Sequence, residues 1–181
     1  MPSSFSVNVT CFSWKKPTAI RYPNMATEES SLPIQQRELG VGEILSEGCD
    51  ILLLSLGHMN LLAMKVKERL QIEGIDPTVV DPIFVKPLDT ELLLRLISTH
   101  KYIITLEEHS IHGGLGTSIN TFIAQNNLSP EKIINLAIPD IFLEQGSYRD
   151  ILAEAGLTED LIYKTLISEL SNLLPSLAGA T

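Results

Sequence analysis

The feature that most constrains the fold is an uninterrupted apolar run, DILLLSL, at Asp50–Leu56. A short run of aliphatic residues predicts a β-strand that is covered on both faces. Strands of this kind occur in parallel sheets, because the helices that connect parallel strands pack on the faces of the sheet. The run therefore predicts an α/β fold rather than a sheet with one face in water.

The segments after this run alternate between helical and extended patterns. Apolar residues spaced three or four apart indicate helices, and further short apolar runs indicate strands. The predicted elements are a helix at Met59–Glu73 ended by Gly74, a strand at Pro77–Asp81, a helix capped by Asp89, a strand at Tyr102–Glu107, a helix at His112–Asn126, a strand at Lys132–Ala137, and two closing helices opened by a capping box at Ser147 and Asp150 and by an acidic turn after Thr158. This alternation predicts a doubly wound, mainly parallel sheet with helices on both faces.

The first 36 residues have a different character, rich in Ser, Thr and Pro. Within them, Pro17–Pro23 (PTAIRYP) predicts one strand bounded by prolines, and the sequence NMATEESSLP predicts a linker. A single strand needs a neighbouring sheet, and the local sequence offers none. We therefore expect the chain to begin inside a domain whose remainder lies outside this sequence.

Composition limits the classes of function. The 181 residues carry a net charge of −9 with a pI of about 4.8, which argues against a nucleic-acid or anionic-membrane surface. The sequence has no apolar stretch of membrane-spanning length and no signal-peptide pattern, so we expect a soluble cytoplasmic protein. Cys11 and Cys49 have neither zinc-site nor redox-pair spacing, and we expect two free thiols.

The most conspicuous candidate site is the turn Glu107–Gly116, EEHSIHGGLG, which joins a predicted strand to a predicted helix. Glycines beside the free N–H groups of a helix N-terminus are the physical basis of a phosphate cradle. However, the glycine spacing matches no phosphate-binding fingerprint, and the turn contains no Lys or Arg. The favoured interpretation is a structural turn in which one of the two glutamates caps the helix, with ligand binding as the alternative.

Other candidates follow the strands at the same edge of the sheet, where doubly wound folds bind ligands. His109 and His112 could join Glu107 or Glu108 in a metal site, but such groupings arise often by chance and we predict no metal. The role of the two histidines stays open. His58 is interpreted as a loop residue, and Lys86 of the sequence VKPLD is interpreted as solvated. Arg21 could clamp a phosphate or pair with a surface acid.

Several motifs together resemble one family. The sequences KPTAIRYP, DPIFVKPLD, TLEEHSIHGGLG, IPDIFLEQGS and ILAEAGLT stand in the order and at the separations seen in the C-terminal part of the 1-deoxy-D-xylulose-5-phosphate synthases. These are transketolase-like thiamine-diphosphate enzymes. The resemblance extends from about Lys16 to Leu170, and RYPN with EEHSIHGGLG resembles the chlamydial branch in particular.

The resemblance implies a transketolase C-terminal-like domain at residues 38–175, preceded by the end of a pyrimidine-binding domain at 1–23 and a linker at 24–37, and followed by a tail at 176–181. It implies that the full enzyme, a homodimer, condenses pyruvate with glyceraldehyde 3-phosphate on thiamine diphosphate and Mg²⁺. The catalytic and cofactor-binding residues of the family lie upstream. We therefore expect none in this chain, no activity from it alone, and the upstream domains as its partners.

The family also implies one substrate contact, a phosphate-binding pattern R-Y-P-R. Here the pattern reads Arg21-Tyr22-Pro23-Asn24, so the substrate-phosphate position is carried by Arg21 and a neutral Asn24. On a strand, residues three apart point to opposite faces, so Arg21 does not simply replace the missing arginine. The alternative function is a non-catalytic dimerisation or docking module, like the equivalent domain of 2-oxo acid dehydrogenase β-subunits.

Overall fold

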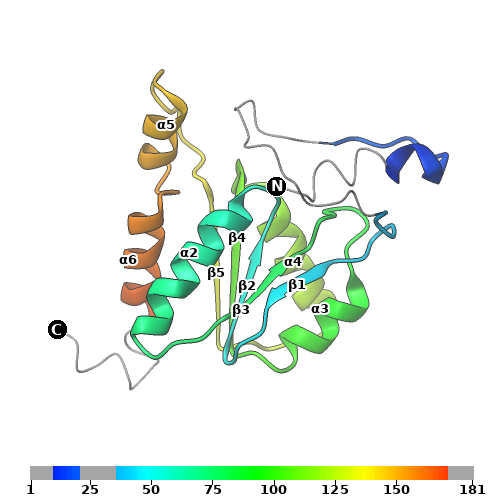
Figure 1. Ribbon diagram of the computed structural model, residues 1–181, viewed down its shortest axis with the longest axis horizontal. Helices are drawn as coiled ribbons and strands as arrows, with labels where there is room; N and C mark the ends of the chain where they lie inside the picture. The colour runs from blue at the N-terminus through cyan, green and yellow to red at the C-terminus, as the bar shows by residue number, and fades with distance from the viewer. Residues whose placement is uncertain (1–9, 21–35, 171–181) are drawn as a thin grey trace.

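The computed structural model describes residues 10–20 and 36–170, and Figure 1 shows their arrangement. The elements, in chain order, are a short 3₁₀ helix η1 (Phe12–Trp14), β1 (Glu43–Ser46), β2 (Ile51–Ser55), α2 (Met59–Ile72), β3 (Thr78–Asp81), α3 (Thr90–Ile97), β4 (Tyr102–Ser110), α4 (Leu115–Gln125), β5 (Lys132–Ile138), α5 (Tyr148–Glu154) and α6 (Glu159–Leu170). In this part of the chain no helix is both long and apolar enough to cross a membrane.

The sheet has five strands in the order β1-β3-β2-β4-β5. β3, β2, β4 and β5 run parallel, and β1 pairs antiparallel with β3 at one edge. The predicted mainly parallel, doubly wound fold is confirmed. The chain moves from β2 outward to β3 and then returns to the other side of β2 for β4, so the topological switch point lies between β2 and β4.

β2 is the centre of the core, since all five of its residues are buried. Ile51 and Leu53 belong to the apolar cluster under α2 and α6, whereas Leu52 and Leu54 belong to the cluster under α3 and α4. The alternation follows from the two-residue period of a strand. It places helices on both faces of the sheet, as Figure 1 shows and as the apolar run predicts.

The structure differs from the sequence-based expectation in several places. β1 was not predicted, because four half-buried residues carry no clear alternation. β4 runs three residues beyond Glu107, and α4 begins at Leu115 rather than His112. Of the strand expected at Pro17–Pro23, residues 17–20 are described and form no strand, and the rest lies outside the described residues.

The candidate residues Arg21 and Asn24 also lie outside the described residues, as do most of the linker and the 176–181 tail.

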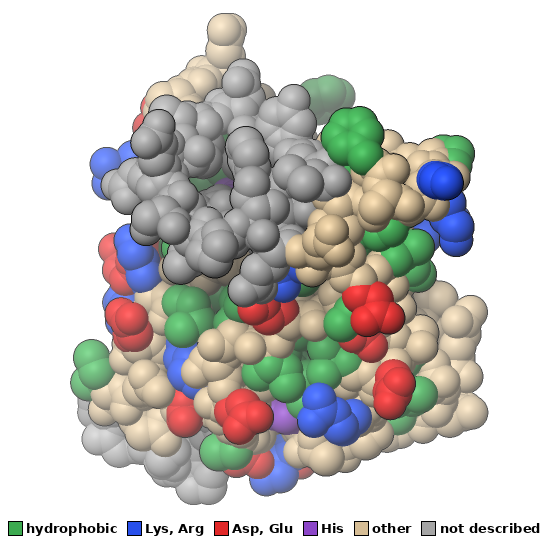
Figure 2. All heavy atoms as spheres, turned by 45° about the vertical axis from the view of Figure 1, so that its right-hand side comes forward, with side chains coloured by type: hydrophobic (Ala, Val, Ile, Leu, Met, Phe, Trp, Pro, Cys, Tyr) green, Lys and Arg blue, Asp and Glu red, His purple; other side chains and the backbone are tan. Residues whose placement is uncertain are grey.

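On the face drawn in Figure 2, acidic and basic side chains of the described residues are interspersed with hydrophobic ones. Cys49 is a free thiol, as expected.

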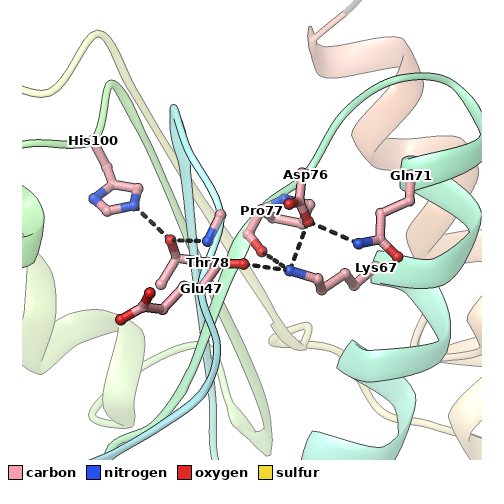
Figure 3. Close-up of polar contacts among 8 residues, drawn as sticks. Glu47, Lys67, Gln71, Asp76, Pro77, Thr78 and His100 are labelled. Atoms are coloured by element: carbon pink, nitrogen blue, oxygen red, sulfur yellow. Dashed lines mark hydrogen bonds and ion pairs between the residues drawn. The ribbon is translucent and has the colours of Figure 1, made fainter.

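A buried lysine links three segments at the edge of the sheet where the parallel strands begin, the amino-terminal edge (Figure 3). Lys67 of α2 is only 4% exposed. Its Nζ donates to the Glu47 carbonyl at 2.9 Å and the Pro77 carbonyl at 2.7 Å, and lies 2.7 Å from Asp76 Oδ1. The hydrogen bond from Lys67 lowers the pKa of Asp76. One ammonium group thus joins α2, the β1–β2 turn and the start of β3.

A histidine makes a second link at this edge. His100 Nε2 lies 2.8 Å from Thr78 Oγ1, and His100 Nδ1 lies 2.7 Å from the Leu96 carbonyl. Thr78 Oγ1 also accepts from the Gly48 N–H at 3.1 Å. The end of α3 is therefore tied to the start of β3, and the polar groups that these contacts bring together satisfy one another.

Replacing Lys67 by Met should lower the free energy of unfolding by about 2–4 kcal/mol, because methionine fills the space of the stem but leaves two inward-facing carbonyl groups without their donor. Urea denaturation of the purified chain measures this loss. The control is Lys65→Met, at an exposed position two residues earlier on α2, which should change the free energy by less than about 0.5 kcal/mol. Equal losses in the two variants would contradict a specific role for Lys67.

Candidate functional site

The candidate site lies at the carboxyl-terminal edge of the parallel strands, beside the switch point between β2 and β4. Three elements contribute to it: the N-terminus of α2, the end of β4 and the N-terminus of α5. The crevice beyond the strand ends at a switch point is the usual ligand position in doubly wound sheets. Its side chains therefore decide what this domain can bind.

His58, Glu108 and Tyr148 meet at this edge. His58 Nε2 lies 2.6 Å from Glu108 Oε2, and the Tyr148 hydroxyl donates to the same carboxylate oxygen at 2.5 Å. The Tyr148 oxygen is also 3.1 Å from His58 Nε2. Burial, and then the hydrogen bond to Glu108, raise the pKa of Tyr148. We call these three residues the polar trio.

The sequence marks His58 and Glu108 as separate candidates but gives no sign of Tyr148. The tyrosine follows Glu108 by 40 residues, and no local pattern links the two. The available signal was the capping box, which the structure confirms: the Ser147 side chain accepts from the Asp150 N–H, and the Asp150 carboxylate accepts from the Ser147 N–H. That box makes Tyr148 the first residue of α5 and so directs it toward the sheet edge.

Glu107 has a different task from its neighbour Glu108. It is 1% exposed, and its carboxylate accepts the Leu115 N–H at 2.7 Å and the Gly116 N–H at 2.8 Å. These are free N–H groups of the first turn of α4, where a negative charge is favourable. The predicted structural turn with a capping carboxylate is confirmed, and Glu107 is the capping residue.

Each glycine of the turn has a structural reason, and the cap by Glu107 accounts for one of them. Gly113 has a φ of +81°, a conformation that favours glycine. A Cβ at Gly114 would lie 2.2 Å from Glu107 Oε2, and a Cβ at Gly116 would lie 2.9 Å from Thr105 Oγ1. Gly114 therefore makes room for a carboxylate of the chain itself, and Gly116 makes room for the Thr105 side chain.

The histidines of the turn are not gathered with Glu107. His109 Nδ1 lies 3.0 Å from the Ser110 carbonyl, and His112 Nε2 lies 3.8 Å from Asp140 Oδ2 with both side chains mostly exposed. Among residues 10–20 and 36–170, no group of three His, Cys, Asp or Glu side chains is placed to hold a metal ion.

The loops after β3 carry polar contacts that hold the edge together. Asp81 is 1% exposed and accepts from Asn60 Nδ2 at 2.6 Å and from the Ile83 N–H at 2.8 Å, and burial raises its pKa. Asp89 caps α3 as predicted, with Oδ1 accepting from the Leu92 N–H at 2.9 Å. Lys86 is exposed, also as predicted.

Replacing Glu107 by Gln should lower the free energy of unfolding by about 1.5–3 kcal/mol, because a charged acceptor of two backbone N–H groups becomes a neutral side chain with one acceptor oxygen. Chemical denaturation measures the loss. Glu68→Gln, at an exposed position on α2, makes the same chemical change as a control and should leave the stability within about 0.5 kcal/mol. An unchanged stability in Glu107→Gln would refute the capping role.

Two similar chlamydial proteins carry the same name. The chain is 47% identical to 1-deoxy-D-xylulose-5-phosphate synthase of Chlamydia trachomatis serovar L2 over 159 residues, which are 86% of this chain and 25% of that protein. It is 46% identical to the Chlamydia muridarum protein of the same name over 164 residues, 90% of this chain and 26% of that protein. The chain thus spans about a quarter of the length of these relatives.

Solved structures agree on the fold. A split-gene transketolase, described as an inactive tetramer, superposes with a TM-score of 0.68 at 30% identity, covering 80% of this chain and 46% of that one. A transketolase mutant from Pichia stipitis gives a TM-score of 0.51 at 16% identity, over 74% of this chain and 18% of that one, and supports the fold alone. The family model described as "Transketolase, C-terminal domain" matches residues 40–162. The chain belongs to the transketolase C-terminal domain family.

Proposed function

We propose that this chain is the C-terminal domain of a 1-deoxy-D-xylulose-5-phosphate synthase. Such an enzyme is a transferase of the transketolase class that condenses pyruvate with glyceraldehyde 3-phosphate, an early step toward isoprenoid precursors. The observation that carries the proposal is the 47% identity over 159 residues to the C. trachomatis protein of that name. Because the chain spans about a quarter of that protein, the reaction requires the longer polypeptide.

The described residues do not fit the cofactor of such an enzyme. The glycine-rich turn before α4, the best candidate for a diphosphate, already holds the Glu107 carboxylate on its N–H groups. A diphosphate there would face a buried negative charge. We therefore assign thiamine diphosphate and Mg²⁺ to the upstream part of the longer protein, and no step of the reaction to this turn.

The substrate contact that we assign to this chain is at Arg21-Tyr22-Pro23-Asn24. An arginine binds a phosphate through two parallel hydrogen bonds, whereas an asparagine offers neutral donors without charge attraction. We assign the phosphate of glyceraldehyde 3-phosphate to Arg21 and Asn24, with weaker attraction than two arginines would supply. We also assign the longer enzyme to the cytoplasm as a homodimer.

A second candidate function is an assembly module without a catalytic role. The observation in its favour is the split-gene transketolase, since that relative is described as an inactive tetramer. This chain covers 46% of that relative. Under this alternative the domain contributes association alone.

Activity measurements with the upstream portion decide between the two functions. The purified chain alone should release no CO₂ from pyruvate. The chain should form product from pyruvate and glyceraldehyde 3-phosphate, with thiamine diphosphate and Mg²⁺, when it is mixed with the upstream portion of the C. trachomatis synthase. A fusion in which the chain replaces the matched quarter of that synthase should do the same. A folded fusion that forms no product would support the assembly module, and activity of the chain alone would contradict the absence of catalytic residues.

The phosphate assignment predicts a gain of function. Asn24→Arg in the active fusion should lower the KM for glyceraldehyde 3-phosphate by roughly tenfold, since one charge-assisted hydrogen bond is added, and should leave the KM for pyruvate unchanged. Gln36→Arg adds the same charge at an exposed position and is the control. Equal effects of the two substitutions, or none of either, would remove Asn24 from the phosphate site.

A further inference from the structure

Large apolar side chains remain exposed at the same edge as the polar trio. Phe142 is 104% exposed, Ile141 and Leu61 are each 60% exposed, and Tyr148 is 37% exposed. Leu61 lies in the first turn of α2, Ile141 and Phe142 lie in the β5–α5 connection, and Tyr148 begins α5. We call these four residues the apolar patch.

Hydrogen bonds hold the elements that carry the patch. The contact of Tyr148 with His58 joins α5 to the N-terminus of α2, and Leu61 follows His58 by three residues, which places both on one side of that helix. The β5–α5 connection is anchored where the Ile111 N–H donates to the Ile138 carbonyl at 2.8 Å. The capping box at Ser147 fixes its other end. Phe142 is therefore presented by an anchored loop.

An aromatic side chain presented in this way is typical of a protein interface. Exposed apolar residues scattered singly need no explanation, but several at one edge around satisfied polar groups resemble the centre of a binding surface. Aromatic residues are enriched among the side chains that contribute most to such surfaces. The patch therefore has the exposure and the residue types of an interaction surface.

The path of the chain indicates the occupant. β1 is antiparallel to β3, and its first residue Glu43 pairs with Asp81, the last residue of β3. The polypeptide therefore enters the domain at the carboxyl-terminal edge. The described residues 10–20 stay at this edge, where Trp14 packs on Phe84 with ring centroids 5.6 Å apart. Figure 1 shows η1 and α5 at the same end of the sheet.

Polypeptide that precedes the domain therefore arrives at the same end of the sheet as the apolar patch, although β1 and β5 are opposite edge strands. The matched relatives have about three quarters of their length outside the region that this chain covers, because 159 residues are 25% of the C. trachomatis protein. The domain family is a C-terminal one, so that remainder comes before it. A large upstream body at this edge is a sufficient occupant for the patch.

We propose that Leu61, Ile141, Phe142 and Tyr148 form the surface on which the upstream part of the longer protein docks, with Phe142 as its anchor. This inference rests on the proposed function only in identifying that upstream part. The polar trio lies within the surface and aligns α5 with α2, and the capping box then orients the loop that carries Phe142.

Hydroxyl-radical footprinting measures the burial of these side chains directly. Phe142 should react at least about fivefold more slowly in the fusion with the upstream C. trachomatis portion than in the isolated chain, as expected for a desolvated anchor. Ile72 is 84% exposed at the far end of α2 and is the matched control, with less than about a twofold change expected. Undiminished reactivity of Phe142 in the fusion would overturn the inference.

Binding of the separate parts provides a second measurement. Phe142→Ser should raise the dissociation constant for the upstream portion by about 30-fold, and Ile72→Ser should leave it unchanged. Circular dichroism of each variant establishes that the exposed substitutions keep the fold. Equal weakening by both variants, or by neither, would refute the assignment.

Two results separate this inference from the proposed function. Docking that depends on Phe142 in a fusion without synthase activity would retain the surface and reject the function. An active fusion in which Phe142 stays reactive would retain the function and reject the surface. If the chain alone forms a dimer that Phe142→Ser disrupts, the occupant is a second copy of the chain, and the proposed upstream occupant is wrong.

Discussion

The ion–dipole contact between Glu107 and the N-terminus of α4 organises the functional edge of this domain. A buried carboxylate is stable only when hydrogen-bond donors surround it, and here the Leu115 and Gly116 N–H groups supply two. The contact fixes where α4 begins and requires glycine at position 114. The contact also uses the backbone N–H donors that an external anion would need, so these donors are not available to an anionic ligand.

Successive residues of a strand point to opposite faces of the sheet, so Glu108 points away from Glu107 and makes different contacts. Odd-numbered residues of β4, such as Ile103, face α3 and α4, and even-numbered ones, such as Leu106, face α2 and α6. Glu107 therefore points under α4, while Glu108 reaches His58 and Tyr148 on the other side. Two adjacent carboxylates thus separate into a structural cap and the centre of a polar contact that positions α5.

The sequence predicts interactions that are local or periodic and misses those that the tertiary structure creates. The caps at Asp89 and Ser147 were predictable because donor and acceptor lie within three residues of each other. The cap by a glutamate was predictable from the helix start, but which glutamate takes the role depends on strand phase. Tyr148 could not be assigned to Glu108 across 40 residues. Lys67 likewise reads as an ordinary helix-surface lysine until β3 covers it.

The two edges of the sheet divide structural and binding roles. At the amino-terminal edge, Lys67 and His100 tie neighbouring segments together through contacts that satisfy their own polar groups. At the carboxyl-terminal edge the Glu107 carboxylate and the polar trio also have hydrogen-bond partners, yet Phe142 and Ile141 stay in water. Keeping large apolar side chains exposed has no structural benefit for the isolated domain. A domain whose glycine-rich turn before α4 is filled by its own carboxylate, and whose polypeptide enters at the end of the sheet where Phe142 is exposed, is suited to position other parts of a protein.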